Sequence, residues 1–484
     1  MAESLKNQTV SGVAWSFLER YATQGVSFII TIIMARLLSP SEYGLLGMLA
    51  IFISISQVFI DGGFSNALIQ KKEKCDEDFS TVFYINVGIS LVFYAILFFC
   101  APLIARFFNE PQLVLITRVY TFNLVINALA AVNKTKLTIA VDFKTQLKIS
   151  LIAATTSGVA GIIAAYNGFG VWALVLQYML SALLNVVLSF VYVKWHPSFI
   201  FSKESFNSLF KFGSKLLGAQ LIGTVYVNLY NLAIGKRYSA EQLGYYTRAG
   251  QFGQLVSSNL SSIMTRVSFP VLSQVQDDDE RLISVYKRFI QVVAFIVFPL
   301  SLGLGGIAKP MILSLLGAKW AGSILLLQIL SFAYMCDGIT IINLNLLYVK
   351  GRSDYVLRLE IIKKSIAFAI LFATIWFGLE VICIGQAVYS LIAVALNTHY
   401  TNKILNYGIV KQVKDIYKYF LVSLVMAVIA VLIGEIIRNC YVALVACLAV
   451  CPVFYFGACK VMHLYAFDEC MGIAKDKIRS WRSR

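Results

Sequence analysis

Long apolar stretches separated by short polar turns recur along the whole chain. About 20 apolar residues are enough for a helix to cross the hydrocarbon core of a bilayer. By that criterion the pattern predicts an all-α polytopic membrane protein with an even number of spans, which places both termini on one side. The fourteen predicted spans are residues 11–37, 43–68, 80–104, 112–132, 149–166, 170–193, 212–235, 245–269, 289–307, 323–348, 361–377, 381–402, 419–437 and 441–462.

Composition supports a chain that is solvated by lipid rather than by water. Of its 484 residues, 59% are hydrophobic and 14% are charged, whereas a soluble domain carries about 25% charged residues. The first apolar run, from Ser11 to Leu37, is too long for a cleavable signal peptide and lacks a small-residue cleavage site. We therefore expect this run to be retained as the first span.

The net charge of +16 has two explanations, which the positions of the charges separate. A basic soluble protein would suggest nucleic-acid binding, but basic residues of membrane proteins gather in cytoplasmic loops. With the N-terminus inside, the cytoplasmic segments carry 30 of the 41 Lys and Arg residues and the opposite face carries 8, while three lie within spans. This bias predicts cytoplasmic termini and excludes nucleic acid as a partner.

Motifs of metal binding and of catalysis are absent from the sequence. The nine cysteines and three histidines show no metal-ligand spacing, so we expect free thiols and no metal site. No Walker A pattern occurs. The longest loop, from Lys194 to Lys211, is too short for a soluble catalytic domain. We therefore predict a protein that is not an enzyme and uses no cofactor.

Two turns 200 residues apart are similar and indicate an internal repeat. Arg36 to Gly44 and Lys236 to Gly244 share Arg/Lys, Ser, Glu/Gln and Gly at matching positions, and each contains a predicted capping box. Six spans separate the turns, so the repeats have the same orientation and a pseudo-two-fold axis along the membrane normal. The predicted domains are 1–200 (spans 1–6), 201–410 (spans 7–12) and 411–484 (spans 13 and 14 with a basic cytoplasmic tail).

Polar side chains recur at spacings of three and four residues along spans 1, 7 and 8. Interhelical hydrogen bonds would explain common Ser and Thr residues. Stripes this long on repeat-related spans instead favour a water-filled cavity. We predict that Gln24, Gln220 and Asn228 line this cavity.

Charged residues within spans are costly and usually functional. Arg20 lies about 14 Å into its span and Arg118 about 9 Å, at about 1.5 Å per residue. Arg266 lies about one turn from the inner interface, where snorkelling is the competing explanation. We predict that these arginines bind an anionic substrate, and that Asp337, halfway along its span, and Asp61 are candidates for ion coupling.

Three stretches of sequence carry a resemblance to a known family. Leu37-Leu38-Ser39-Pro40, followed by Glu42-Tyr43-Gly44, resembles the turn after the first helix of bacterial polysaccharide flippases. Phe269-Pro270-Val271-Leu272-Ser273 and Lys350-Gly351-Arg352 are similar to two further family stretches. The chain thus resembles the Wzx-like, colanic-acid-exporter-like branch of the multidrug, oligosaccharidyl-lipid and polysaccharide exporter superfamily.

This resemblance implies two six-helix lobes around a cationic cavity and alternating access, in the inner membrane of a bacterium. It implies a flippase that moves a polyprenyl-diphosphate-linked oligosaccharide from the inner to the outer leaflet, for lipopolysaccharide or exopolysaccharide synthesis. Arg20 and Arg118 are the counterparts of cavity arginines that hold the diphosphate, whereas the matching role of Arg266 is in doubt.

Electrostatics agrees with this function. A diphosphate carries about two negative charges and needs guanidinium partners once it is dehydrated. Moving both charges outward across an inside-negative membrane gains about 4–5 kcal/mol at 100 mV. The membrane potential alone would therefore bias export, and a proton or Na⁺ is a candidate coupling partner that is not required.

Two other functions stay open. A cation-coupled multidrug exporter of the same superfamily would line its site with carboxylates and aromatics; the arginines argue against it, and Asp337 and Asp61 argue for it. A membrane-embedded glycan polymerase or ligase would carry a large outer loop with catalytic residues, and the predicted outer loops are short.

Overall fold

The computed structural model describes residues 2–71 and 73–482, so Lys72 and Arg484, two of the basic residues counted above, lie outside the described residues. The described chain consists of helices and the turns between them, with no strand, and this confirms the predicted all-α class. Contacts divide the chain into two compact units, Met1–Gly244 and Tyr245–Arg484, which are described separately below.

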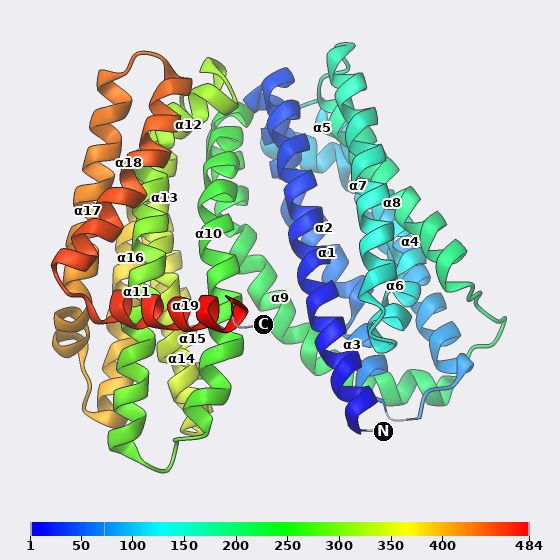
Figure 1. Cartoon of the computed structure of the whole chain (residues 1–484). Helices are drawn as coiled ribbons and strands as arrows, with labels where there is room; N and C mark the ends of the chain where they lie inside the picture. Colours follow the sequence, from blue (N-terminus) through cyan, green and yellow to red (C-terminus); the bar gives the residue numbers. More distant parts are fainter. Residues whose placement is uncertain (1, 72, 483–484) are drawn as a thin grey trace. The chain divides into compact units, whose positions relative to one another are not determined.

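The first unit is a bundle of helices in which long helices that are consecutive in sequence run in opposite directions (Figure 1). Its helices are α1 (Ala2–Leu37), α2 (Pro40–Asp61), α3 (Phe64–Gln70), α4 (Asp76–Phe108), α5 (Leu113–Tyr120), α6 (Asn123–Ile139), α7 (Phe143–Tyr166), α8 (Val171–Val193) and α9 (Lys203–Arg237). α1 packs mainly against α7, and α9 packs against α2, α3 and α4.

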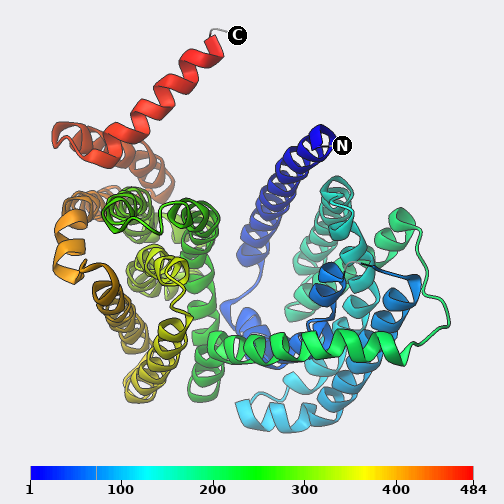
Figure 2. The same cartoon turned by 90° about the horizontal axis from the view of Figure 1, so that it is seen from below.

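The second unit contains the rest of α10, which begins at the end of the first unit, and all later helices (Figure 2). They are α10 (Ala240–Ser273), α11 (Asp279–Gly306), α12 (Ala308–Leu315), α13 (Ser323–Met335), α14 (Asp337–Val349), α15 (Ser353–Thr374), α16 (Leu379–Leu405), α17 (Ile409–Ile436), α18 (Cys440–Val461) and α19 (Tyr465–Arg482), with a short 3₁₀ turn at Ala318–Trp320.

Each of the fourteen predicted spans coincides with one long helix or with two consecutive helices. In the described part of the chain, ten of these fourteen are long and apolar enough to cross a membrane. The other four are α1, α9, α10 and α15, whose polar stripes and charges lower their hydropathy. The total of fourteen spans, the lobes 1–200 and 201–410 and their symmetry therefore stay predictions.

The helices extend beyond the predicted spans, and three spans are interrupted. α9 begins at Lys203, nine residues before its predicted span, because hydropathy marks only the apolar part of a helix. Gly62 and Gly63, both with positive φ, separate α2 from α3. A second interruption at residues 121–122 separates α5 from α6, and a third at Cys336 separates α13 from α14.

The two repeated turns have the predicted local structure. The Ser39 amide donates to Glu42 Oε2 at 2.5 Å, at the start of α2. The Ser239 amide donates to Gln242 Oε1 at 3.5 Å and the Gln242 amide donates to Ser239 Oγ at 3.2 Å, at the start of α10. Both helices therefore begin with hydrogen bonds of the capping-box type.

These two helix starts cross in a reciprocal way. A Cβ atom placed on Gly44 would lie 1.7 Å from the carbonyl oxygen of Ala240, and one placed on Gly244 would lie 1.9 Å from that of Pro40. Gly44 and Gly244 are 200 residues apart, and so are Pro40 and Ala240, so each contact joins the repeat counterparts of the other. In a two-fold arrangement residue i contacts j and j contacts i, so this crossing supports the predicted repeat.

A buried polar network joins four helices of the second unit. The Tyr286 hydroxyl of α11 donates to Asn343 of α14, and the Gln412 amide of α17 donates to Tyr286 at 2.9 Å. The Asn343 amide donates to Thr398 Oγ1 of α16 at 3.3 Å. All four side chains are almost fully buried, and their mutual hydrogen bonds offset the cost of removing polar groups from water.

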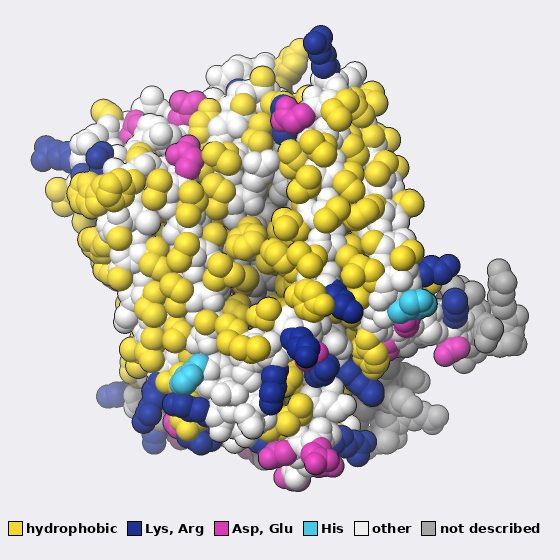
Figure 3. Space-filling view, turned by 90° about the vertical axis from the view of Figure 1, so that its left-hand side faces the viewer, with side chains coloured by type: hydrophobic (Ala, Val, Ile, Leu, Met, Phe, Trp, Pro, Cys, Tyr) yellow, Lys and Arg dark blue, Asp and Glu magenta, His cyan; other side chains and the backbone are white. Residues whose placement is uncertain are grey.

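The surface on the side of α17 and α18 carries a broad band of hydrophobic side chains (Figure 3). Lys and Arg side chains gather at the lower end of this face. Large apolar residues of α17 and α18, including Leu432, Val445 and Val453, are exposed. An apolar exposed band of this kind is the surface that faces lipid in helical membrane proteins.

Candidate functional site

A polar groove lies between α2 and α9 in the first unit. It has a volume of about 390 Å³ and is lined by Gln220, Thr224 and Asn228 of α9 with Ser54 and Val58 of α2, together with Gly223 and Val227. Gln220 and Asn228 were both predicted to line a cavity, and the structure brings them to the same groove. Its amide and hydroxyl groups are neutral, which suits hydrogen bonds to hydroxyl-rich ligands.

Local helix geometry explains why these side chains share the groove. Gln220, Thr224 and Asn228 are four residues apart, so they lie on one face of α9. The Asn228 amide donates to the Thr224 carbonyl at 3.0 Å. Where α2 ends at Gly62 and Gly63, it packs closely on α9, because a Cβ on Gly63 would lie 2.7 Å from the Gly213 oxygen. Sequence analysis missed Ser54, although Gln57 and Asp61 follow it at helical spacing and could have indicated a polar face of α2.

Arg20 is exposed on α1 and makes no hydrogen bond or ion pair with any described residue. Its neighbour Glu19 instead accepts from the Ser150 hydroxyl of α7 at 3.3 Å. Gln24 lies four residues after Arg20 and is half-buried on the same helix face. α1 therefore presents a guanidinium and an amide together, and no described acidic residue forms an ion pair with the guanidinium.

Arg118 has a different environment from Arg20. It is half-buried in α5, its Nε donates to the Phe98 carbonyl at 3.4 Å, and its guanidinium carbon lies 4.7 Å from the centre of the Phe98 ring. This is a cation–π contact within the α4–α5 pair. α5 packs on α4 and α8, whereas α1 packs mainly on α7. Among the described residues, the structure therefore shows no direct contact between Arg118 and Arg20.

Asp61 lies at the end of α2, next to the break at Gly62. It accepts from the Gln57 amide at 3.1 Å. Lys134 of α6 interacts electrostatically with both Asp61 and Glu19, although its ammonium makes no ion pair with a described residue. Sequence analysis counted Lys134 only as a basic loop residue. The Lys134 ammonium therefore adds a positive charge near Asp61 of α2 and Glu19 of α1.

Asp337 and Arg266 both lie in the second unit. Asp337 is half-buried at the start of α14, directly after the break at Cys336, and accepts from the Ser257 hydroxyl of α10 at 2.5 Å. Buried Lys363 of α15 interacts electrostatically with it and forms an ion pair with Glu360 at 2.5 Å. Arg266 is exposed, about 10 Å before the end of α10 at about 1.5 Å per residue.

An apolar pocket of about 470 Å³ lies among α10, α11, α17 and α18 in the second unit. Pro299, Gly303, Met426, Cys447 and Cys451 line it, with further aliphatic and aromatic residues of the same helices. The pocket surface is almost wholly apolar, which suits a hydrocarbon-like group. Hydropathy did not indicate this pocket, because lipid-facing and packed residues of these helices are both mainly apolar.

The first unit carries exposed cations and a neutral polar groove. The second unit carries a carboxylate at a helix break and an apolar pocket. Comparison with known proteins assigns a class to this arrangement. Residues 33–325, which make up more than half of the chain, match the family model described as polysaccharide biosynthesis protein. The chain belongs to this family, which confirms the resemblance found in the sequence.

Curated relatives extend over most of the chain. The teichuronic acid biosynthesis protein TuaB of Bacillus subtilis is 24% identical over 88% of this chain and 89% of its own length. The lipopolysaccharide biosynthesis protein WzxC of Escherichia coli is 26% identical over 74% of each chain. The succinoglycan biosynthesis transport protein ExoT of Rhizobium meliloti is 25% identical over 66% of this chain and 65% of its own.

Two solved structures show the same fold. The lipid II flippase MurJ in an inward closed conformation superposes with a TM-score of 0.75 at 14% identity, over 93% of this chain and 98% of that one. An inward-facing multidrug resistance MATE family transporter superposes with a TM-score of 0.60 at 15% identity, over 81% of this chain and 98% of that one. The protein is therefore a multi-pass membrane protein with a fold shared by flippases and drug transporters.

Proposed function

We propose that this protein is a flippase that moves a polyprenyl-diphosphate-linked oligosaccharide from the inner to the outer leaflet by alternating access, without enzymatic activity. Three relatives are named for the synthesis of teichuronic acid, succinoglycan or lipopolysaccharide, and one of these is named a transport protein. Those names and the family support a role in the supply of a surface polysaccharide.

The observation that carries this proposal is the environment of Arg20. A guanidinium on a helix of 36 residues, long enough to cross a bilayer, has no acidic partner in the described chain. An unpaired cation at such a depth is expensive unless water or an anionic ligand compensates it. A diphosphate offers several oxygens in the geometry that a guanidinium binds with two hydrogen bonds.

Each unit, taken by itself, has a cavity whose chemistry suits one part of such a ligand. The amides and hydroxyls of Gln220, Thr224 and Asn228 suit sugar hydroxyl groups. The apolar pocket lined by Gly303, Met426 and Cys451 suits a polyprenyl chain. A cationic drug would instead need carboxylates or aromatics at the groove, and the groove residues include neither.

We further propose that the protein lies in the inner membrane of a bacterium with both termini cytoplasmic. Basic side chains gather at the lower end of the face that carries α17 and α18 (Figure 3). The charge bias of the sequence, with 30 basic residues on the inner side and 8 on the outer, sets the orientation. The diphosphate would then leave the inner leaflet down the membrane potential.

Deletion of the gene tests the function. We expect loss of one surface polysaccharide while its lipid-linked repeat unit accumulates on the inner leaflet, and rescue by the intact chain. Export of cationic dyes should not change. A strain that keeps its surface polysaccharide but becomes sensitive to cationic drugs would instead support the multidrug exporter.

Ion coupling is proposed for Asp337, with a proton or Na⁺ as the coupling ion. Its carboxylate lies at a helix break and accepts a hydrogen bond from Ser257 at 2.5 Å, and intramembrane acids of this kind take part in ion relays. We expect Asp337→Asn to make export insensitive to collapse of the ion gradient, measured as initial export rates with and without ionophore. Asp354→Asn, at an exposed acid paired with Arg352 at 2.9 Å, is the matched control. An unchanged ionophore response in Asp337→Asn would assign the carboxylate a packing role.

A further inference from the structure

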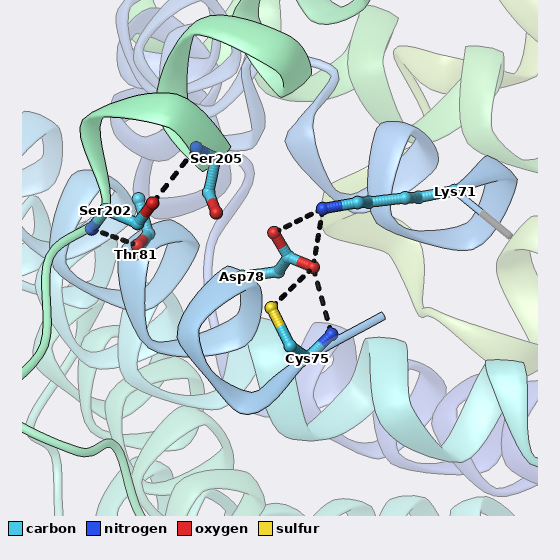
Figure 4. A network of polar contacts seen from close by, with 6 residues as sticks. All are labelled: Lys71, Cys75, Asp78, Thr81, Ser202 and Ser205. Carbon is cyan, nitrogen blue, oxygen red and sulfur yellow. Dashed lines mark hydrogen bonds and ion pairs between the residues drawn. The ribbon is translucent and has the colours of Figure 1, made fainter. Parts of the chain in front are cut away.

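The connection between α8 and α9, residues 194–202, is fixed to the start of α4 by its backbone. The Ser198 amide donates to Ser80 Oγ at 3.0 Å, and the Ser202 amide donates to Thr81 Oγ1 at 3.0 Å. The acceptors Ser80 and Thr81 are fully buried. Ser202 also accepts from the Ser205 amide at 3.2 Å, which caps α9 (Figure 4). The connection is thus held at its middle and at its C-terminal end.

The platform beneath this connection is itself cross-linked. Asp78 is fully buried and accepts from Lys71 Nζ at 2.7 and 2.8 Å and from the Cys75 amide at 3.0 Å (Figure 4). The hydrogen bond to Asp78 raises the pKa of Lys71, so this lysine stays charged at neutral pH. The end of α3 and the start of α4 therefore form one rigid support.

Three consecutive apolar residues project from the fixed connection. Phe199 is 99% exposed, Phe201 57% and Ile200 46%. The connection extends away from the first unit in both ribbon views (Figures 1 and 2). The Phe201 ring contacts Phe206 of α9, with 6.4 Å between ring centres, but the described chain leaves much of the surface of these three side chains exposed. Exposed apolar surfaces of this kind mark an interaction site.

Charge and aromatic composition identify the partner as a lipid surface. Lys194 and Lys203 are exposed at the two ends of the apolar residues, and Glu204 is the acid nearest in sequence. Trp195 packs edge-on against Phe79 and Phe83 of α4, and Lys136 Nζ lies 4.9 Å from the Trp195 ring centre. Tryptophan and lysine side chains are typical of the headgroup level of a bilayer.

We propose that residues 194–203 form an interfacial anchor, in which Phe199, Ile200 and Phe201 insert at the headgroup–acyl boundary and Lys194 and Lys203 bind anionic headgroups. Apolar insertion combined with basic flanks is the way in which peripheral segments bind anionic membranes. Because α9 begins at Lys203, the anchor sets the depth of the helix that lines the polar groove. The inference requires only a membrane protein and does not depend on the transported substrate.

The test uses the full chain in nanodiscs, with 4-fluorophenylalanine at Phe199, a near-isosteric change that leaves folding intact. Fluorine NMR then measures line broadening by a lipid with a nitroxide near its headgroup and by a water-soluble gadolinium chelate. We expect at least twofold stronger broadening by the lipid probe, and a larger lipid effect with 30% phosphatidylglycerol than with phosphatidylcholine alone. Lys194→Gln with Lys203→Gln should remove the dependence on phosphatidylglycerol.

The same label at Phe169 is the matched control. Phe169 is 60% exposed in the connection between α7 and α8 and has no Lys or Arg within ten residues, so its signal should not respond to phosphatidylglycerol. Broadening of the Phe199 signal mainly by the gadolinium chelate would overturn the anchor and assign the surface to a protein partner. Protection from both probes, or an equal response to both lipid compositions, would also overturn it.

Discussion

Arg20→Ala should abolish export of the lipid-linked oligosaccharide while the protein remains in the membrane in normal amount. Arg20 makes no contact that the fold needs within the described residues, so its removal should leave the structure intact. Hydrogen bonds to charged groups contribute about 1.5–3 kcal/mol each, which predicts roughly a 10- to 100-fold loss of substrate affinity for one such bond. Binding to the purified protein and export in cells are the two measurements.

Arg20→Lys separates the charge of this residue from its geometry. A lysine keeps the positive charge but binds a phosphate as a point charge, without the two-pronged hydrogen bonding of a guanidinium. We therefore expect partial rescue, with export between that of the alanine variant and the wild type. Arg281→Ala, at an exposed arginine outside the predicted spans, shows whether loss of any exposed cation has the same effect.

Normal export by Arg20→Ala would contradict the binding role. Arg20 lies about 26 Å along α1 from Leu37, at about 1.5 Å per residue. In a hydrocarbon core of about 30 Å, this position is close to the inner boundary if the outer end of α1 is at the outer boundary. Arg20 would then be an interfacial anchor, and Lys134 would be the next cation to test.

Much of the architecture followed from hydropathy because lipid imposes a simple rule on spanning helices. A spanning segment must be apolar and long, and it must satisfy its own backbone. The breaks at Gly62, Phe122 and Cys336 were not predicted, because hydropathy averaged over a whole span hides interruptions of one to three residues such as Asp61-Gly62-Gly63. α19 was not predicted either, since hydropathy has no signal for a helix outside the bilayer.

Candidate site residues were harder to predict than the helices that carry them. Gln220 and Asn228 share a groove because their four-residue spacing fixes one helix face. The direction of the Arg118 side chain depends instead on Phe98, which is 20 residues away in sequence. The partners of Ser80 and Thr81 are also set by packing, because Ser198 and Ser202 are 118 and 121 residues away in sequence. Sequence spacing does not report such contacts.

Gly44→Ala and Gly244→Ala should each lower the thermal stability of the purified protein by a similar amount. Added methyl groups would lie 1.7 Å from the Ala240 oxygen and 1.9 Å from the Pro40 oxygen, and both obstacles are backbone atoms. Overpacking costs about 1–3 kcal/mol, and the whole helix start must move to relieve it. Gly88→Ala is the matched control, because a Cβ there has no atom within 4 Å.

The double variant, Gly44→Ala with Gly244→Ala, tests whether the two contacts form one symmetric crossing. Once the first methyl group has separated the helix starts, the second one should cost little, so the combined loss should be smaller than the sum of the single losses. Additive losses, or a large effect at one glycine and none at the other, would show two independent contacts and would argue against the 200-residue repeat. A double variant as stable as Gly88→Ala would mean that the helix starts do not touch in the membrane.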